Sequence, residues 1–249
     1  MMIRKGLTAA VLALVLAGGV SAADLGGQAL VVGSDTTTPP MESIDEATGA
    51  IVGFDVDVVN AICARINCKA QFVTTAWDGI FAALAQGEFD MVASNVSITE
   101  EREKIIDFSE PYFVVSQSVL VRLADEDMTL DALKSGKKLG AQTGTTNAAL
   151  AEELVGRANM SVYDTGPAAV LALKNGDVDA VIVDAVTGVA YEQQFAGDLV
   201  VAIEGLQSDP LGLAFQEGSE LVAAFNEGLA AIKADGTLDT LAAKYFVSK

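Results

Sequence analysis

The sequence predicts an α/β protein with two lobes of similar design. Short apolar runs alternate with segments whose apolar residues recur at helical spacing along the 249-residue chain. A phrase is also repeated: ALAQGEFDMVASN fills residues 83–95, and ALKNGDVDAVIVD fills residues 172–184. We interpret each phrase as a helix, a glycine that ends it, and the strand that follows. This alternation predicts parallel sheets with right-handed crossovers. A chance repeat of a common unit is the alternative.

The elements follow in the same order in both halves. In the first half, we expect strands and helices in alternation over residues 30–35, 53–66, 70–76, 77–87 and 89–95. In the second half, we expect the same alternation over residues 138–144, 146–157, 161–165, 167–176 and 179–183. The first helix starts near Asp55 and repeats apolar residues at helical spacing, and the second ends at Gly87.

Residues 1–22 have the composition of a secretory signal peptide. Arg4 and Lys5 form a basic start, an apolar stretch of about a dozen residues follows, and small residues surround Ala22 and Ala23. The apolar stretch is too short to span a bilayer comfortably, and no later stretch is long and apolar enough to do so. We expect an exported protein that is cleaved after Ala22 or Ala23. A buried N-terminal helix is the alternative.

The composition excludes several function classes. The formal net charge is −19, and loss of Arg4 and Lys5 makes it more negative still. Such a polyanion does not bind nucleic acid or an anionic membrane by default. The chain has no histidine, which rules out histidine-based triads and histidine metal ligands. We expect no metal site and no cofactor.

The two cysteines, Cys63 and Cys68, lie close together in the sequence. In an oxidising compartment we expect them to form a disulfide. It would stabilise the fold by about 2 kcal/mol in the chain-entropy model. Two buried thiols and a two-cysteine metal site are the alternatives.

Two polar residues stand at the ends of the repeated strands. Ligands of open α/β sheets bind beyond the carboxyl ends of the strands, and Asn95 and Asp184 occupy those ends, one in each predicted lobe. A carboxylate at the end of an apolar strand needs a positive partner, which an ammonium ligand or a nearby lysine could supply. Lobes that face each other would bring both side chains into one cleft.

A third polar stretch is suited to a carboxylate ligand. We expect a helix to begin in VSITEEREK, residues 96–104, with Thr99 as its N-cap and Arg102 in its first turn. The Arg102 guanidinium could form a bidentate pair with a carboxylate held near that helix end. A solvated arginine paired with a neighbouring glutamate is the alternative.

Backbone donors are expected near a second helix start. QTGTTN, residues 142–147, places Gly144 with Thr143 and Thr146 directly around the start of a helix. Free N–H groups at such a start bind anions. Together with Arg102 and Asp184, they predict a site for the zwitterionic head group of an amino acid.

Eight phrases in the mature chain carry a resemblance to a known family: GSDTTTPPME, GFDVDVVNAI, AWDGIFAAL, FDMVASNVSITEERE, IDFSEPYF, LGAQTGTTN, ALKNGDVDAVIVD and IKADGTLDTLAAKYF. In these phrases the sequence resembles the bacterial periplasmic polar amino acid-binding proteins, solute-binding family 3. The resemblance implies the two-lobed, type II periplasmic binding protein-like fold with two hinge-strand crossings. It also implies a periplasmic protein that delivers an amino acid to the membrane permease of an ABC transporter.

The same resemblance implies the domain boundaries. Lobe 1 would comprise residues 24–113 and 208–249, and lobe 2 residues 117–205. The crossings would fall near Val114–Ser116 and Gly205–Ser208. We expect a monomer.

The resemblance also implies which residues bind the head group of the ligand. The resemblance implies that Arg102 grips the ligand carboxylate, with help from Ser97 and Thr146. It implies that Asp184 binds the ammonium, with help from the segment Ser94–Asn95.

The side-chain pocket departs from the family pattern. Trp77 and Asp35 stand where family members contact the ligand side chain, but Thr38 and Met41 replace an aromatic residue and a phenylalanine. The pocket is therefore less aromatic than a two-sided clamp, and Thr38 could bond a polar neutral side chain. A core tryptophan, and an aspartate that caps a turn, are the alternatives for Trp77 and Asp35. We expect a polar or basic amino acid ligand: Arg, Lys, ornithine, His or Gln.

Two other function classes stay open. Some proteins of this fold resemble dehydratases that act on small carboxylic acids, although the chain lacks histidine and an obvious acid placed as proton donor. A free sensory ligand-binding protein that contacts a membrane receptor is the other alternative.

Overall fold

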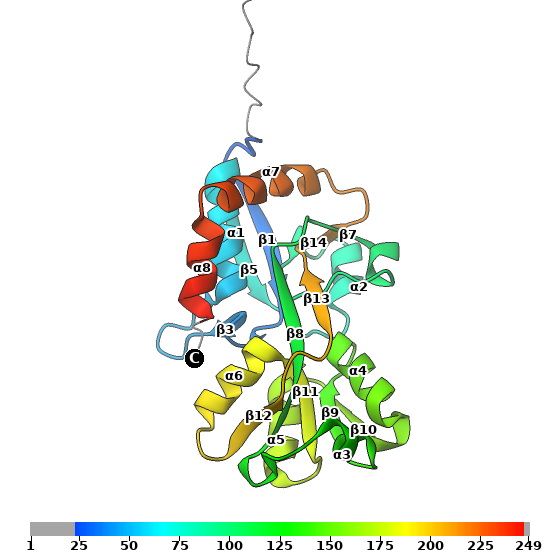
Figure 1. Ribbon diagram of the computed structural model, residues 1–249. Coiled ribbons are helices and arrows are strands. Elements are labelled where there is room, and N and C mark those ends of the chain that lie inside the picture. Colours follow the sequence, from blue (N-terminus) through cyan, green and yellow to red (C-terminus); the bar gives the residue numbers. More distant parts are fainter. Residues whose placement is uncertain (1–22, 247–249) are drawn as a thin grey trace, which may run out of the picture.

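The computed structural model describes residues 23–246, which form two α/β lobes joined by extended strands (Figure 1). The predicted signal peptide, residues 1–22, lies outside the described residues. Within the described part, no helix is both long and apolar enough to cross a membrane.

The upper lobe in Figure 1 is built on a five-stranded sheet with the order β5-β1-β6-β14-β7. Strand β1 runs parallel to β5 and β6, whereas β14 runs antiparallel to β6 and β7. The strands are β1 (Gln28–Ser34), β5 (Cys68–Thr74), β6 (Met91–Val92), β7 (Ile106–Phe108) and β14 (Ala214–Gln216).

Helices cover both faces of this sheet, so the side chains of β1 and β6 are buried on both sides. Leu30 of β1 belongs to a core shared with three helices, while Val92 of β6 faces a second core around Trp77 and Leu84. Burial on both faces is the usual setting for parallel strands. The helices are α1 (Phe54–Ile66), α2 (Ile80–Ala85), α7 (Leu221–Ala234) and α8 (Thr237–Tyr245).

The lower lobe is built on a six-stranded sheet with the path β10-β9-β11-β8-β12, and β13 also pairs with β8. Its strands are β8 (Phe113–Arg122), β9 (Leu139–Gln142), β10 (Met160–Tyr163), β11 (Ala180–Asp184), β12 (Leu199–Ile203) and β13 (Ser208–Leu211). Its helices are α3 (Leu130–Lys134), α4 (Thr146–Val155), α5 (Gly166–Asn175) and α6 (Ala185–Gln194). Alternate residues of β11 face two cores, Ile182 on one side and Val181 on the other.

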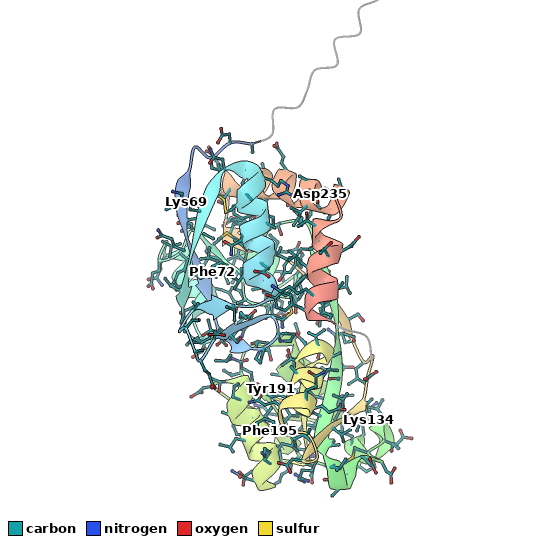
Figure 2. The ribbon with its side chains drawn as sticks, turned by 90° about the vertical axis from the view of Figure 1, so that its left-hand side faces the viewer. Lys69, Phe72, Lys134, Tyr191, Phe195 and Asp235 are labelled. Atoms are coloured by element: carbon teal, nitrogen blue, oxygen red, sulfur yellow. A yellow bond between two sulfur atoms is a disulfide. The ribbon has the colours of Figure 1, made fainter. Side chains whose placement is uncertain are left out.

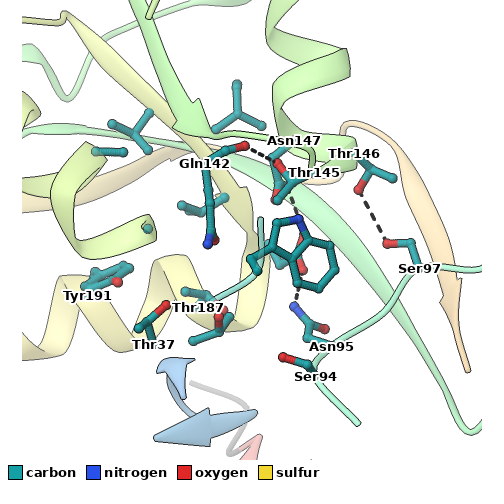
Figure 3. A pocket seen from close by; sticks show the side chains of 18 of the residues that line it. Thr37, Ser94, Asn95, Ser97, Gln142, Thr145, Thr146, Asn147, Thr187 and Tyr191 are labelled. Carbon is teal, nitrogen blue, oxygen red and sulfur yellow. Dashed lines mark hydrogen bonds between the residues drawn. The ribbon is translucent and has the colours of Figure 1, made fainter. Parts of the chain in front are cut away.

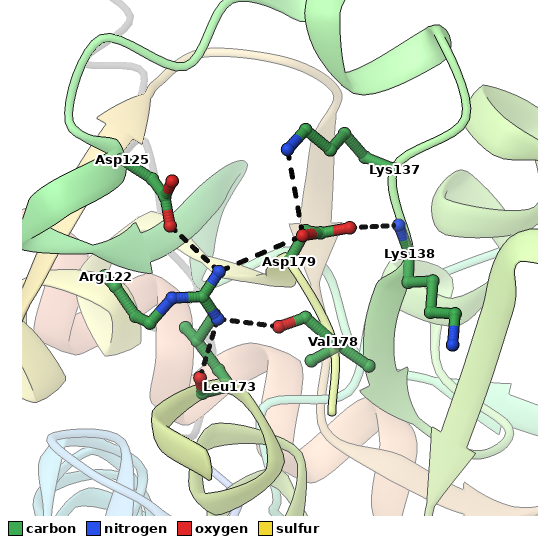
Figure 4. A network of polar contacts seen from close by, with 7 residues as sticks. All are labelled: Arg122, Asp125, Lys137, Lys138, Leu173, Val178 and Asp179. Atoms are coloured by element: carbon green, nitrogen blue, oxygen red, sulfur yellow. Dashed lines mark hydrogen bonds and ion pairs between the residues drawn. The ribbon is translucent and has the colours of Figure 1, made fainter. Parts of the chain in front are cut away.

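Polar contacts fix the end of the lower sheet away from the upper lobe (Figure 4). Arg122, the last residue of β8, donates to the carbonyls of Leu173 and Val178 at 2.9 and 2.8 Å and pairs with Asp125 at 2.9 Å. These bonds join β8 to the end of α5 and to the segment before β11.

The repeated phrase has the same structural role in both lobes. Gly87 and Gly176 end α2 and α5 with φ of 78° and 83°, a region that favours glycine. Directly before the strands that follow, β6 and β11, Asp90 accepts from the Val31 N–H at 2.7 Å and Asp179 accepts from the Lys138 N–H at 2.8 Å. Each aspartate thereby binds the adjacent strand segment, which explains why the chain carries the phrase twice.

Two strands lie between the lobes. The first residues of β8, Phe113–Ser116, pair antiparallel with β13, and its remaining residues pair with β11 and β12.

A small third sheet, made of β2 (Thr37–Thr38), β3 (Glu42–Ile44) and β4 (Ile51–Val52), extends the upper lobe. The exact lobe boundaries given above stay a prediction.

All ten predicted strands and helices are present, but two details differ. The sheets are mixed rather than wholly parallel, since β7, β8, β12, β13 and β14 add antiparallel pairs. The helix expected within residues 96–104 is a single 3₁₀ turn, Arg102–Lys104, although the Thr99 hydroxyl does accept from the Arg102 N–H at 3.3 Å.

The predicted disulfide between Cys63 and Cys68 is confirmed. It joins the last turn of α1 to the first residue of β5, so the helix and the strand that follow each other in sequence are also tied covalently. Figure 2 shows the side chains packed in the two lobes, with Phe72 of β5 in the upper lobe and Tyr191 and Phe195 of the α6 segment in the lower.

Gly53 allows β3 to approach the start of α1. Its φ is 146°, and a Cβ there would overlap the carbonyl oxygen of Met41. The Phe54 and Asp55 N–H groups donate to the Pro40 and Met41 carbonyls, both at 3.0 Å. We expect Gly53→Ala to lower the free energy of unfolding by about 2 kcal/mol or more, because a strained backbone and a backbone clash act together.

Urea denaturation measures this loss. Gly49→Ala is the control, because Gly49 also has positive φ, 71°, but has open space at its Cβ position. It should cost about 1 kcal/mol. Equal losses in the two variants would contradict the role given to close approach.

Candidate functional site

A narrow cavity of about 50 Å³ lies between the lobes and is lined by residues of both (Figure 3). The upper lobe contributes Thr37, Thr38, Trp77, Ser94, Asn95, Ser97 and Arg102. The lower lobe contributes Gln142, Thr145, Thr146, Asn147, Gly166, Ala169, Val181, Ile182, Val183, Asp184, Thr187 and Tyr191. Eight of the ten predicted ligand-binding residues line this cavity, and Asp35 and Thr143 do not.

Asp184 is held by amides from both lobes. It ends β11 and precedes α6, and its side chain is 7 % exposed. Its carboxylate accepts from Asn95 Nδ2 at 2.6 Å and from Asn147 Nδ2 at 2.9 Å. The two ends of the repeated phrase are therefore bonded to each other. Burial raises the pKa of Asp184, and the two amide hydrogen bonds oppose that rise.

Arg102 lies in the cavity without a carboxylate partner. Its guanidinium donates to the Ser97 carbonyl at 2.8 Å and, across the cleft, to the Gly144 carbonyl at 3.3 Å. Within residues 23–246 it takes part in no ion pair. Burial lowers the pKa of Arg102 to about 10, so the group is still charged at neutral pH. The alternative for Arg102, a solvated side chain paired with a neighbouring glutamate, is therefore not found in the structure.

Two aromatic rings flank the Arg102 guanidinium. Its central carbon lies 5.2 Å from the Trp77 ring centroid and 5.1 Å from that of Phe81. Cations over aromatic faces gain about 0.5–2 kcal/mol. Trp77 lines the cavity but is only 8 % exposed, so it both packs in the core and orients the arginine.

The start of α4 faces the same cavity. Thr145 is its N-cap, with its hydroxyl accepting from the Ala148 N–H at 3.1 Å. The first backbone N–H groups of a helix lack partners inside the helix, so those of Thr146 and Asn147 are available to an anion. The Thr146 and Ser97 hydroxyls lie 3.4 Å apart across the cleft.

Asp35 and Thr143 have other partners. Asp35 is buried at 3 % exposure and accepts from Thr37 Oγ1 at 2.9 Å and from Gln142 Nε2 at 2.8 Å, the latter across the cleft. The Thr143 N–H donates to the Tyr163 carbonyl at 2.9 Å, continuing the pairing of β9 with β10, and Thr143 does not line the cavity. Their assigned contact with a ligand stays a prediction.

Sequence reasoning missed several polar residues of the lower lobe. Thr187 Oγ1 and the Tyr191 hydroxyl are buried, line the cavity and have no hydrogen-bond partner among residues 23–246. They follow Asp184 by three and seven residues on one helix face, and this spacing was a usable signal. Gln142 could not be found this way, because its bond to Asp35 spans 107 residues of sequence.

Comparison with known families agrees with this geometry. A family model described as bacterial extracellular solute-binding proteins, family 3, matches residues 30–248. The chain belongs to this family.

Relatives with this architecture carry names of amino acid-binding proteins. The probable histidine-binding protein of Neisseria gonorrhoeae is 33% identical over 228 residues, which cover 90% of this chain and 85% of the relative. ABC transporter arginine-binding protein 1 of Escherichia coli (strain K12) is 35% identical, over 86% of this chain and 89% of its own. The L-cystine-binding protein TcyJ of the same organism is 32% identical, over 87% and 82%.

Solved structures of amino acid-binding proteins are also similar to this chain. An ancestral arginine-binding protein bound to glutamine has a TM-score of 0.83 at 35% identity and covers 88% of this chain and 98% of its own. The arginine-, lysine-, histidine-binding protein ArtJ from Geobacillus stearothermophilus has a TM-score of 0.82 at 34% identity, with 89% and 96% covered. In this family 3 protein, Thr38 lines the cavity, whereas Met41 is fully buried in the core of the upper lobe.

The raised pKa of Asp184 has a consequence for stability. A carboxyl with a raised pKa in the folded state is easier to bury protonated than ionised. The folded protein is therefore favoured at low pH, and this stability is lost as the pH rises above the ordinary carboxyl pKa of about 4. We expect Asp184→Asn to raise the melting temperature at neutral pH without ligand. Asn95, whose Oδ1 is buried without a partner, can turn its amide to bond the new side chain.

Thermal unfolding at neutral pH and at about pH 4 tests this expectation. The increase in melting temperature of Asp184→Asn over wild type should be smaller at the lower pH. Asp177→Asn, at an exposed position, serves as the control and should change the melting temperature little. A lower melting temperature for Asp184→Asn at neutral pH would show that the carboxylate stabilises the empty site.

Proposed function

We propose that this family 3 protein binds an amino acid between its lobes and delivers it to the permease of an ABC transporter. One observation carries the proposal: a charged guanidinium with no carboxylate partner and a buried carboxylate with no cationic side chain against it line the same cavity. Both statements concern residues 23–246. An amino acid head group supplies the two missing opposite charges at once.

The carboxylate half of the head group would be held by Arg102. The guanidinium is held by backbone carbonyls and two rings, which leaves N–H donors for a ligand. Backbone N–H groups at the start of α4 and the hydroxyls of Ser97 and Thr146 lie at the same wall. Hydrogen bonds to charged groups are about twice as strong as neutral ones.

The ammonium half would be held by Asp184. A carboxylate has roughly four acceptor positions, and the two asparagine amides use two of them. The buried, unpartnered Asn95 Oδ1 offers a further acceptor beside it. An ammonium ion placed there would favour the charged form of Asp184 and remove the cost of burying it alone.

The side-chain end of the cavity supports a polar or basic ligand. Trp77, Thr38, Gln142 and the unpartnered hydroxyls of Thr187 and Tyr191 give it donors and acceptors. Asp35 adds a negative charge behind Gln142. The relatives named above for histidine, arginine and cystine fit this chemistry. Arg, Lys, ornithine, His and Gln are the candidates, and Glu and Asp are disfavoured because Asp35 would repel them.

Binding would close the two lobes on the ligand. We propose lobe 1 at residues 24–113 and 208–249, lobe 2 at 117–205, and hinges near Val114–Ser116 and Gly205–Ser208. The ligand favours the closed form because only there do both lobes contact it. We further propose a periplasmic monomer released from a signal peptide at residues 1–22. The lysine/arginine/ornithine-binding periplasmic protein of Escherichia coli (strain K12), 33% identical over 226 residues, supports that location.

An enzymatic role is the weaker candidate. Within the described residues, Asp184 is the one acidic side chain in the cavity lining, and both its oxygens accept from amides. A similar solved structure is an ancestral amino acid-binding protein described as a precursor of cyclohexadienyl dehydratase, with a TM-score of 0.79 at 34% identity. Turnover of prephenate or arogenate by the purified protein would favour this candidate over binding alone.

Arg102→Ala should weaken every amino acid ligand by about 2–5 kcal/mol, because it removes one partner of a buried charge pair that all amino acids share. Isothermal titration calorimetry with L-arginine and L-glutamine measures the loss. Arg157→Ala is the matched control, since the Arg157 side chain is 83% exposed and its removal should leave affinity unchanged. An Arg102→Ala affinity within threefold of wild type for the better probe would refute the assigned role.

A thermal-shift screen of the twenty amino acids and ornithine should give its largest shifts with polar or basic side chains. Asp35→Asn should reduce the shift caused by basic amino acids more than that caused by glutamine, because only the former gain from the negative charge. Glu or Asp as the best ligand would overturn the pocket assignment. Equal effects of Asp35→Asn on basic and neutral ligands would remove Asp35 from ligand selection.

A further inference from the structure

Two carboxyl groups lie fully buried behind the cavity without lining it. Glu42 belongs to β3 and Asp55 to the first turn of α1, and both have 0% exposure. Neither takes part in an ion pair within the described part of the chain. Buried acids are nearly always paired with a cation, so this pair needs another explanation.

The pair is bonded to the segment that forms one wall of the site. Asp55 Oδ2 accepts from the Asn95 N–H at 2.7 Å, and Glu42 Oε1 accepts from the Ser94 hydroxyl at 3.3 Å. Asn95 has a left-handed backbone with φ of 51°, a conformation that non-glycine residues adopt at a cost. The bonds from the two acids therefore hold this segment in the shape that directs the Asn95 amide at Asp184.

The same pair also reaches the start of the crossing strand. The Tyr112 hydroxyl donates to Asp55 Oδ1 at 2.7 Å, and Tyr112 directly precedes β8. Asp55 thus has a donor on each oxygen. Glu42 does not: within the described residues, no group donates a hydrogen bond to its buried Oε2. A proton on that oxygen would turn it from an unsatisfied acceptor into a donor. The neighbouring acceptor is the Asp55 carboxylate, since the Asp55 N–H bonds to the carbonyl of the residue before Glu42 and the two acids bond to the adjacent residues Ser94 and Asn95.

We infer that Glu42 is a positioning residue of the binding site in its protonated form, and that one proton shared between Glu42 and Asp55 holds the Ser94–Asn95 segment ready for the ligand. The inference rests on the proposed function only for its effect on affinity. The shared proton itself depends on the geometry of the empty protein.

The electrostatic surroundings favour one charge on the pair and oppose two. Burial and the nearby charges of Asp55 and Asp35 raise the pKa of Glu42 well above its ordinary value. Burial raises the pKa of Asp55 to about 6, against the hydrogen bonds from Asn95, Tyr112 and Glu42. The other titratable group that faces the pair, the Tyr112 hydroxyl, has its own pKa raised by burial and by these acids. Two neighbouring buried carboxylates cannot both ionise cheaply without a cation between them.

The sign of the pH effect follows from this. A carboxyl whose pKa is raised in the folded state contributes stability at low pH and loses that contribution as pH rises through its folded value. Loss of the shared proton leaves two negative charges facing each other, with Glu42 Oε2 still without a donor. Repulsion between these charges disturbs the hydrogen bonds that the two acids accept from the Ser94 hydroxyl and the Asn95 N–H. We expect the segment to loosen, and ligand affinity to fall, under alkaline conditions.

Glu42→Gln separates this role from a merely structural one. Its amide is a permanent neutral donor that mimics the protonated acid and cannot ionise. From neutral pH to about pH 9, because buried glutamates can hold their proton up to about pH 8–9, wild type should lose at least threefold more affinity for L-arginine or L-glutamine than Glu42→Gln does. The comparison at each pH cancels the titration of the amino acid itself. Glu46→Gln, at an exposed position of the neighbouring loop, should follow wild type.

A second measurement needs no ligand. In labelled wild-type protein, the Glu42 carboxyl carbon should report a protonated acid at neutral pH by NMR. The Asn95 amide proton should lose protection from exchange as that group ionises, and keep it in Glu42→Gln. An ionised Glu42 at neutral pH, or parallel pH profiles of Asn95 in the two proteins, would overturn the inference. Failure of all amino acids to bind, with these signals as expected, would count against the proposed function and leave the shared proton standing.

Discussion

Both lobes depend on one strand, because β8 pairs with β13 at its start and with β11 and β12 further on. The register places Asp184, the last residue of β11, opposite Gln117, next to Ser116, which pairs with Ser208 of β13. Asp184 is therefore fixed one residue from the point where the partner of β8 changes from β13 to β11. Its carboxylate also accepts from amides of both lobes, so a change in the angle between the lobes would change what surrounds it.

The local elements were predictable because their signals lie within a few residues. Helical spacing marks α1, and a glycine marks the end of α2 and of α5. Strands β13 and β14 were not, since three- or four-residue segments form strands only when a distant partner supplies the other half of the ladder. The short 3₁₀ turn at Arg102 was overestimated as a helix because an N-cap signal does not set helix length.

The grouping of Asn95, Arg102 and Asp184 around one cavity was predictable for a different reason. Strand ends in α/β sheets collect ligands, and charge chemistry names which side chains suit a zwitterion. The side-chain end resisted prediction, because the Gln142–Asp35 bond joins residues from different lobes. Nothing local in the sequence indicates that a glutamine would shield the aspartate from the cavity. Likewise, the contact of Arg102 with Trp77 and Phe81 depends on how the 3₁₀ turn packs against α2 and the segment before it, which sequence spacing does not determine.

The position of Trp77 has a practical consequence. The chain contains a single tryptophan, and its indole sits in the cavity wall against the guanidinium. Indole emission responds to nearby charge and to exclusion of water, and no second tryptophan contributes a background signal. The protein thus carries an unlabelled optical probe in the wall of the cavity between its lobes. Its ultraviolet fluorescence can follow changes at that wall in real time, in a cuvette or in stopped flow.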